Sequence, residues 1–142
     1  MMSYSAPDPL LTLPTSQRPR GSGRVLVVED ETDLRDTIEL LLTVEGCEAR
    51  GVSDGAAALE LLRDWSPDLI LLDLTLPSMS GEAFISAYQQ TAAPHAPIIV
   101  MTGMDIEAAA ASAIGADSVL LKPFDVANLL EAVAVFVDCS DS

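Results

Sequence analysis

The chain has 142 residues, which is close to the size of one domain. Its formal charge is −15, because 22 acidic residues outnumber 7 basic ones. This balance excludes a module that binds nucleic acid through its own charge, since phosphate contacts need lysine and arginine. Hydrophobic residues make up 49 % of the chain, which argues against disorder throughout.

The cysteine pattern and the apolar runs predict a cytoplasmic protein without a membrane segment. Cys47 and Cys139 show neither CxxC nor zinc-site spacing, so we expect free thiols, with Cys47 packed in a strand. No basic stretch followed by an apolar one marks a secretory signal. The longest uncharged stretch, residues 83–104, contains Pro94 and Pro97 and does not fit one membrane helix.

The composition divides the chain into three parts. Residues 1–23 are rich in proline and glycine and carry no apolar period, which predicts a flexible tail. Residues 24–138 carry regular apolar patterns and form the expected domain. Residues 139–142 are left as a short C-terminal tail, too short for a second domain or a DNA-binding helix.

Short apolar runs alternate with helical patterns along this domain. The runs predict strands over residues 25–28, 47–52, 68–72, 97–101 and 117–121. Apolar spacing and capping residues predict helices over residues 34–46, 54–64, 80–90, 105–114 and 125–137. Strict alternation of this kind predicts an α/β fold, with a parallel sheet covered by helices on both faces.

Polar side chains follow four of these strands. Glu29 and Asp30 follow the first, Asp73 the third, Thr102 the fourth and Lys122 the fifth. In an open parallel sheet, ligands bind beyond the carboxyl ends of the strands. Carboxylates suit Mg²⁺, a lysine neutralises a phosphoryl group, and an aspartate can become phosphorylated. The pattern therefore predicts metal-assisted phosphoryl transfer onto a carboxylate.

Four segments together resemble the receiver domains of two-component response regulators. They are residues 25–30, 68–81, 97–103 and 115–124, and the resemblance covers about residues 24–138. It implies a flavodoxin-like, doubly wound sheet of five parallel strands in the order 2-1-3-4-5 with five helices. It also implies a phosphoacceptor switch in signal transduction rather than a classical enzyme.

The resemblance implies roles for the carboxylates. Asp73 is similar to the phosphoacceptor, which takes a phosphoryl group from a histidine kinase or a histidine phosphotransfer protein. Glu29, Asp30, Asp73 and the backbone carbonyl of Thr75 look like the Mg²⁺ site, with Glu29 acting through water.

The remaining motif residues resemble the parts of the switch. Thr102 is similar to the hydroxyl that moves to bind the phosphoryl oxygen, and Lys122 to the lysine that pairs with it. The small Gly103 would leave access to the phosphate, and a cis bond is expected between Lys122 and Pro123. Val119 stands where the family often has tyrosine or phenylalanine, so the usual movement of an aromatic ring has no counterpart here.

The surface of the last two helical segments predicts a protein partner. Residues 108–114 are rich in alanine, and residues 126–137 are apolar almost all round, which is typical of a buried helix. We expect a downstream protein target or a second copy of the chain to bind the face formed by residues 105–114, 117–121 and 125–137. No direct nucleic-acid partner is expected.

Three alternatives from other classes compete with this hypothesis. A receiver-like scaffold that works without phosphorylation is motivated by Val119 and the apolar last helix. An aspartate-nucleophile phosphatase would need a second aspartate where Thr75 stands. A flavin-binding protein would need a loop of serine, threonine and glycine where the acidic residues 29–31 stand.

Overall fold

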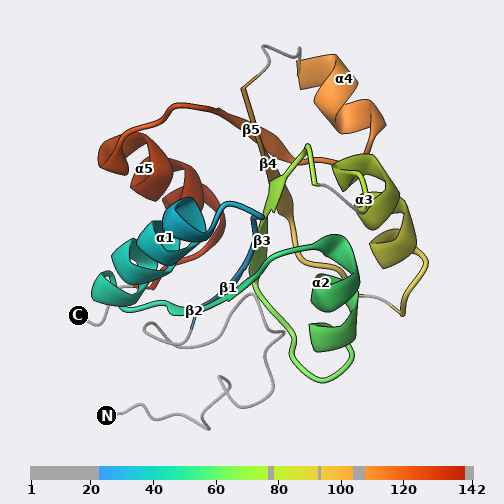
Figure 1. Ribbon diagram of the computed structural model, residues 1–142, viewed down its shortest axis with the longest axis horizontal. Coiled ribbons are helices and arrows are strands. Elements are labelled where there is room, and N and C mark those ends of the chain that lie inside the picture. The colour runs from blue at the N-terminus through green and yellow to red at the C-terminus, as the bar shows by residue number, and fades with distance from the viewer. Residues whose placement is uncertain (1–22, 77–78, 93, 104–107, 140–142) are drawn as a thin grey trace, which may run out of the picture.

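The computed structural model describes residues 23–76, 79–92, 94–103 and 108–139. Strands and helices alternate as predicted (Figure 1). The strands are β1 (Arg24–Val28), β2 (Glu48–Val52), β3 (Leu69–Asp73), β4 (Ile98–Thr102) and β5 (Ser118–Leu121). The helices are α1 (Thr32–Val44), α2 (Gly55–Leu61), α3 (Gly81–Gln89), α4 (Ala108–Ala113) and α5 (Val126–Phe136). The predicted flexible tail and the predicted start of the fourth helix lie outside the described residues.

The five strands form one parallel sheet in the order β2-β1-β3-β4-β5, which confirms the predicted topology. β1 lies between β2 and β3, so the strand order reverses beside it. This reversal places the carboxyl ends of β1 and β3 next to each other, at the point where doubly wound sheets bind their ligands.

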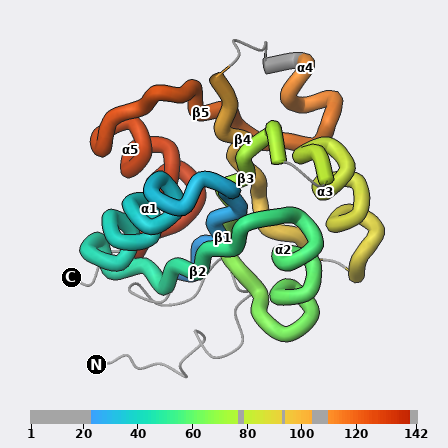
Figure 2. The backbone as a smooth tube through the Cα atoms, in the orientation of Figure 1, coloured from blue at the N-terminus to red at the C-terminus, as the bar shows by residue number. Residues whose placement is uncertain are grey.

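Helices cover both faces of the sheet. α1 and α5 lie on one face, and α2, α3 and α4 lie on the other (Figure 2). One core cluster joins alternate residues of β1 and β3 to Phe84 of α3 and Ala58 of α2. The other joins the intervening residues to Ile38 of α1 and Leu129 of α5. Every residue of β3 and β4 is buried, as a strand covered on both faces requires.

Side chains and turns begin and end the helices where the sequence indicates. Asp54, Ser80 and Asp125 each accept a hydrogen bond from the backbone N–H three residues later. α1 ends at Val44, and the turn after it contains Gly46, whose φ of 96° lies in the left-handed region that favours glycine. α2 is shorter than predicted, because residues 62–65 continue in turns after Leu61.

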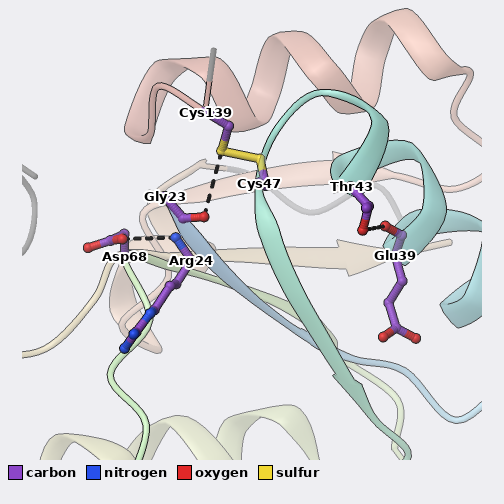
Figure 3. The surroundings of a disulfide bond; sticks show 7 residues. All are labelled: Gly23, Arg24, Glu39, Thr43, Cys47, Asp68 and Cys139. Atoms are coloured by element: carbon purple, nitrogen blue, oxygen red, sulfur yellow. Dashed lines mark hydrogen bonds between the residues drawn. A yellow bond between two sulfur atoms is a disulfide. The ribbon is translucent and has the colours of Figure 1, made fainter. Parts of the chain in front are cut away.

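The prediction of free thiols is wrong. Cys47 and Cys139 form a disulfide across 92 residues of sequence, with their Cα atoms 4.8 Å apart (Figure 3). Cys47 is therefore not a simple packing residue; it lies just before β2 and is bonded to the segment that follows α5. Spacing along the chain does not reveal the pair, because the fold alone brings the two positions together.

The last helix, α5, is only partly buried within the described chain. Only Leu129 and Val133 of α5 are buried, and Val126 and Val135 are exposed. None of the described helices is long and apolar enough to cross a membrane.

Truncation of Phe84 tests the core between the sheet and α3. The Phe84 side chain is fully buried, so we expect Phe84→Ala to lower the free energy of unfolding by about 3–5 kcal/mol, measured by urea denaturation. The matched control is Leu40→Ala on α1, where the leucine is 63 % exposed and the expected change is below about 0.5 kcal/mol. Equal losses in the two variants would contradict the arrangement of this core.

Candidate functional site

The predicted site residues gather at the carboxyl edge of the sheet. Glu29 follows β1, Asp73 and Thr102 are the last residues of β3 and β4, and Lys122 follows β5. Glu29, Asp73 and Thr102 are 1 %, 3 % and 1 % exposed, so three polar side chains end apolar strands without reaching bulk water. Burial of this kind is tolerated only where the polar groups have partners.

Three carboxylates form the acidic part of the site. One oxygen each from Glu29, Asp30 and Asp73 lies within 4.8 Å of the others, and Asp30 is exposed while the other two are buried. Hard carboxylate oxygens that open to solvent on one side suit Mg²⁺, which keeps several of its waters. The donor set therefore fits a divalent cation.

Lys122 holds the two buried carboxylates together. Its Nζ lies 2.9 Å from Glu29 Oε1 and 3.5 Å from Asp73 Oδ2. The backbone supports this position, because the Lys122 N–H donates to the carbonyl of Thr102 at 2.8 Å. A single ammonium thus contacts carboxylates from two neighbouring strands, and the peptide that follows it, Lys122–Pro123, is cis as expected.

The electrostatics of the site separate the two buried acids. Burial raises the pKa of Glu29 above its usual range, although Lys122 acts against this. Burial also opposes ionisation of Asp73, but the hydrogen bond from the Thr75 N–H and the charge of Lys122 outweigh it and lower the pKa of Asp73. Despite burial, the bond to Glu29 and the two negative charges raise the pKa of Lys122. Of the two buried acids, Asp73 is therefore the one that stays ionised more readily.

The loop after β3 contacts Asp73 in a way that the sequence analysis missed. The backbone N–H and the hydroxyl of Thr75 both donate to Asp73 Oδ1, at 3.0 and 3.1 Å. Gly81 lies against this loop, since an added Cβ would come within 2.9 Å of the Leu74 Cα. The resemblance to receiver domains implied a role only for the backbone carbonyl of Thr75. That this carbonyl is a metal ligand stays a prediction.

Arg35 is a second residue that the sequence analysis missed. Its Nη1 donates to the carbonyl of Glu29 at 2.8 Å, from the first turns of α1. The Glu29 side chain is further held by the N–H of Glu31, which donates to Oε2 at 3.1 Å. In the sequence, the only sign of this contact is that Arg35 follows Glu29 by six residues, and that separation is too common to predict a contact.

The environment of the two remaining motif positions is also defined. An added Cβ at Gly103 would meet nothing within 4 Å, so the space beside the end of β4 is open. Val119 is half-buried and packs against the core cluster on the side of α2, α3 and α4. A small aliphatic side chain therefore occupies the place where the family often has an aromatic ring.

The model of the response regulator receiver domain matches residues 25–134. The chain belongs to this family. Receiver domains are phosphoacceptor switches of two-component signal transduction rather than classical enzymes. The match includes all ten strands and helices except the first residue of β1 and the last two of α5.

Relatives and solved structures agree with this assignment. The chain is 39 % identical over 111 residues to the sensory transduction protein RegX3 of Mycobacterium tuberculosis, covering 77 % of this chain and 48 % of that protein. It is 34 % identical over 134 residues to the regulatory protein SphR of Synechococcus elongatus, covering 87 % and 51 %. The chemotaxis response regulator CheY4 of Vibrio cholerae superposes with a TM-score of 0.76 at 27 % identity, covering 82 % of this chain and 99 % of that one. The chain spans about half the length of the curated relatives it matches.

Removal of the Lys122 charge tests the electrostatics of the receiver site. Without added divalent cation, we expect Lys122→Met to lower the free energy of unfolding by about 3 kcal/mol at neutral pH, because Glu29 and Asp73 lose their counter-charge. A raised lysine pKa stabilises the fold below the ordinary value of 10.5, and this stability is lost as the pH rises through the folded pKa. The Lys122→Met variant has no such amine. We therefore expect its free energy of unfolding to fall less at alkaline pH than that of the native chain, measured by urea denaturation at a series of pH values.

Arg63→Met is the matched control for this comparison. Its guanidinium is exposed and, among the contacts of the described chain, pairs only with Glu60, three residues earlier in α2. It should change the free energy of unfolding by less than about 0.5 kcal/mol. It should also lose stability at alkaline pH to the same extent as the native chain. The buried Tyr88, whose pKa burial raises, contributes equally in both variants. If the two variants lose the same stability, Lys122 does not compensate the buried carboxylates.

Proposed function

We propose that the domain formed by residues 24–138 accepts a phosphoryl group on Asp73 from a phosphohistidine of a histidine kinase or a histidine phosphotransfer protein. The observation that carries the proposal is the position of Asp73, an acid of lowered pKa with one oxygen bonded by Thr75 and the other 3.5 Å from Lys122. This geometry supports an ionised nucleophile beside a fixed positive charge. The open space at Gly103 supports access for a phosphoryl donor.

The transfer is a displacement at phosphorus. A carboxylate oxygen of Asp73 forms the new P–O bond while the P–N bond to the donor imidazole breaks, and the electron pair stays on the imidazole nitrogen. Lys122 pairs with the negative charge of the phosphoryl oxygens. Glu29, Asp30, Asp73 and the Thr75 carbonyl would hold a Mg²⁺ ion, which neutralises the charge that accumulates between acid and phosphoryl group.

Phosphorylation would shift the domain between two states. A phosphoryl group on Asp73 adds charge where Lys122 already contacts Glu29, so the ammonium gains a competing partner. Thr102 would bind the phosphoryl oxygen through its hydroxyl, and the change would bias an existing equilibrium. Because Val119 packs in the core, the signal would reach the surface without movement of an aromatic ring.

Labelling with a small phosphoryl donor tests this proposal. With Mg²⁺ and acetyl phosphate, we expect the intact mass to increase by one HPO₃ group, and we expect no adduct in Asp73→Asn. Asp30→Asn should still label, but only at Mg²⁺ concentrations at least about tenfold higher. The control Asp64→Asn removes an exposed acid in the turn after α2 and should label normally. Labelling of Asp73→Asn to the same extent would contradict the proposal.

A protein partner or a second copy would bind the face formed by α4, β5 and α5. Leu121 and Val126 support this, because they are 45 % and 48 % exposed where β5 leads into α5. We expect the partner to be a downstream signalling protein in the cytoplasm. This domain itself would not contact nucleic acid.

Sedimentation velocity tests this face. We expect the phosphorylated domain to sediment as a dimer, or to bind its target, and Leu121→Ser with Val126→Ser to prevent this. Leu40→Ser on α1, which removes a leucine that is 63 % exposed outside the face, should have no effect. A monomer at high concentration, with and without the phosphoryl group, would contradict self-association.

The second candidate is a scaffold that binds its partner without phosphorylation. The packed Val119 favours it, because the aromatic switch residue is missing. It would be preferred if the domain folds and binds Mg²⁺ but takes no phosphoryl group.

A further inference from the structure

The disulfide lies at the opposite edge of the sheet from the carboxylate site. Cys47 comes just before β2, whose first residue Glu48 is paired with Arg24, the first residue of β1. Asp73 is the last residue of β3, so a full strand of five residues, roughly 16 Å at ~3.3 Å per residue, separates the two edges. The chemistry proposed for Asp73 therefore does not account for the disulfide.

The two cysteines are held very differently. Cys47 belongs to the turn that ends α1, where its N–H donates to the Leu42 carbonyl at 3.0 Å and the Gly46 N–H donates to Thr43 at 3.0 Å. Cys139 lies on the segment after α5, which leaves the helix at Val137 in an extended conformation. Loss of the disulfide would therefore loosen the Cys139 side more than the Cys47 side.

A cavity gives small reagents access to this bond. It has a volume of about 380 Å³ and lies between the ends of α1 and α5. Both cysteines line it, together with apolar side chains of α1 and α5 and the acidic residues Glu45 and Asp138. The cysteines are buried, with exposed fractions of 6 % and 7 %, so a reagent has to approach the bond through this cavity.

The fold can hold the pair in either oxidation state. The Cys139 Sγ lies 4.0 Å from the carbonyl oxygen of Gly23, to which a reduced thiol can donate a weak hydrogen bond (Figure 3). Gly23 leaves room for this sulfur, since an added Cβ would come within 2.9 Å of it. Both cysteines also pack in the core cluster of α1 and α5, which does not depend on the covalent bond.

We propose that Cys47 and Cys139 form a reversible thiol–disulfide site that controls the surface between the ends of α1 and α5. In the reducing direction, a thiolate of a small dithiol attacks one sulfur of the bond and the other cysteine leaves as a thiolate. The second thiol of the reagent then attacks the reagent sulfur of this mixed disulfide and displaces the remaining cysteine as a thiolate, so the reagent is oxidised to its cyclic disulfide and the protein holds two thiols. In the cytoplasmic location proposed above, disulfides are rare and are usually transient, catalytic or redox-sensing.

Reduction changes this surface without changing the phosphoacceptor site. The segment containing Val137, Asp138 and Cys139 forms one wall of the cavity, and it loses its covalent link to Cys47 in the turn after α1. The Glu45 carboxylate, on a chain of net charge −15, repels anionic thiols, so neutral reagents are the class that the site favours. The inference does not depend on phosphorylation of Asp73.

Redox titration of the native chain tests the proposal. The oxidised chain is incubated with defined ratios of reduced and oxidised dithiothreitol and is then alkylated. Its intact mass is measured by mass spectrometry. As the share of reduced dithiothreitol rises, we expect the number of alkylated cysteines in the folded monomer to change from none to two. Oxidised dithiothreitol should restore the disulfide. We expect neutral 2-mercaptoethanol to act several-fold faster than anionic 2-mercaptoethanesulfonate. The control is the double variant Cys47→Ser with Cys139→Ser, which should not respond to reagent.

Hydrogen exchange locates the effect of reduction. The Val137 amide, bonded to the Val133 carbonyl, should exchange at least about tenfold faster after reduction, and the double variant should match the reduced protein. The Ile70 amide in β3 should not change, and acetyl phosphate should label Asp73 to within about twofold in both forms. Thiols that stay reduced under oxidised dithiothreitol, a disulfide that resists reduction until urea unfolds the chain, or identical exchange in both forms would each overturn the proposal. Failure of labelling at Asp73 in both forms would instead count against the proposed function alone.

Discussion

The ion pair between Lys122 and Glu29 compensates a carboxylate that the sheet buries almost completely. An unpaired carboxylate in such a place costs several kcal/mol, so the end of β5 must reach the end of β1 across the carboxyl ends of β3 and β4. The same ammonium lies near Asp73, and one positive charge therefore serves two acids. With Asp30 included, negative charge remains in excess at this edge, which is the physical reason that a cation and a phosphoryl group suit the site.

The parallel topology separates two kinds of chemistry. All side chains that could take part in phosphoryl transfer lie at the carboxyl edge, while the disulfide lies at the amino edge. α1 and α5 connect the edges, because each begins near the carboxylates and ends near a cysteine on the same face of the sheet (Figure 1). Along each of these helices, the two kinds of chemistry therefore lie at opposite ends.

Much of the site could be predicted because it depends on strand ends. Glu29, Asp30, Asp73, Thr102 and Lys122 each follow or end an apolar run, and parallel strands bring such positions to one edge. The contacts of Thr75 and Arg35 could not be predicted in this way. They depend on the path of the loop after β3 and on the rotation of α1, which no local pattern specifies.

By itself, the sequence determined the alternation of strands and helices, the parallel sheet with its two covered faces and the set of charges at its carboxyl edge. Apolar periodicity and capping residues act over a few neighbouring positions, so they are visible without coordinates. Only the tertiary structure decided that Cys47 and Cys139 are bonded and that most of α5 is exposed. Both follow from how α1 and α5 pack on one face of the sheet, a contact between distant segments that the spacing of residues along the chain does not encode.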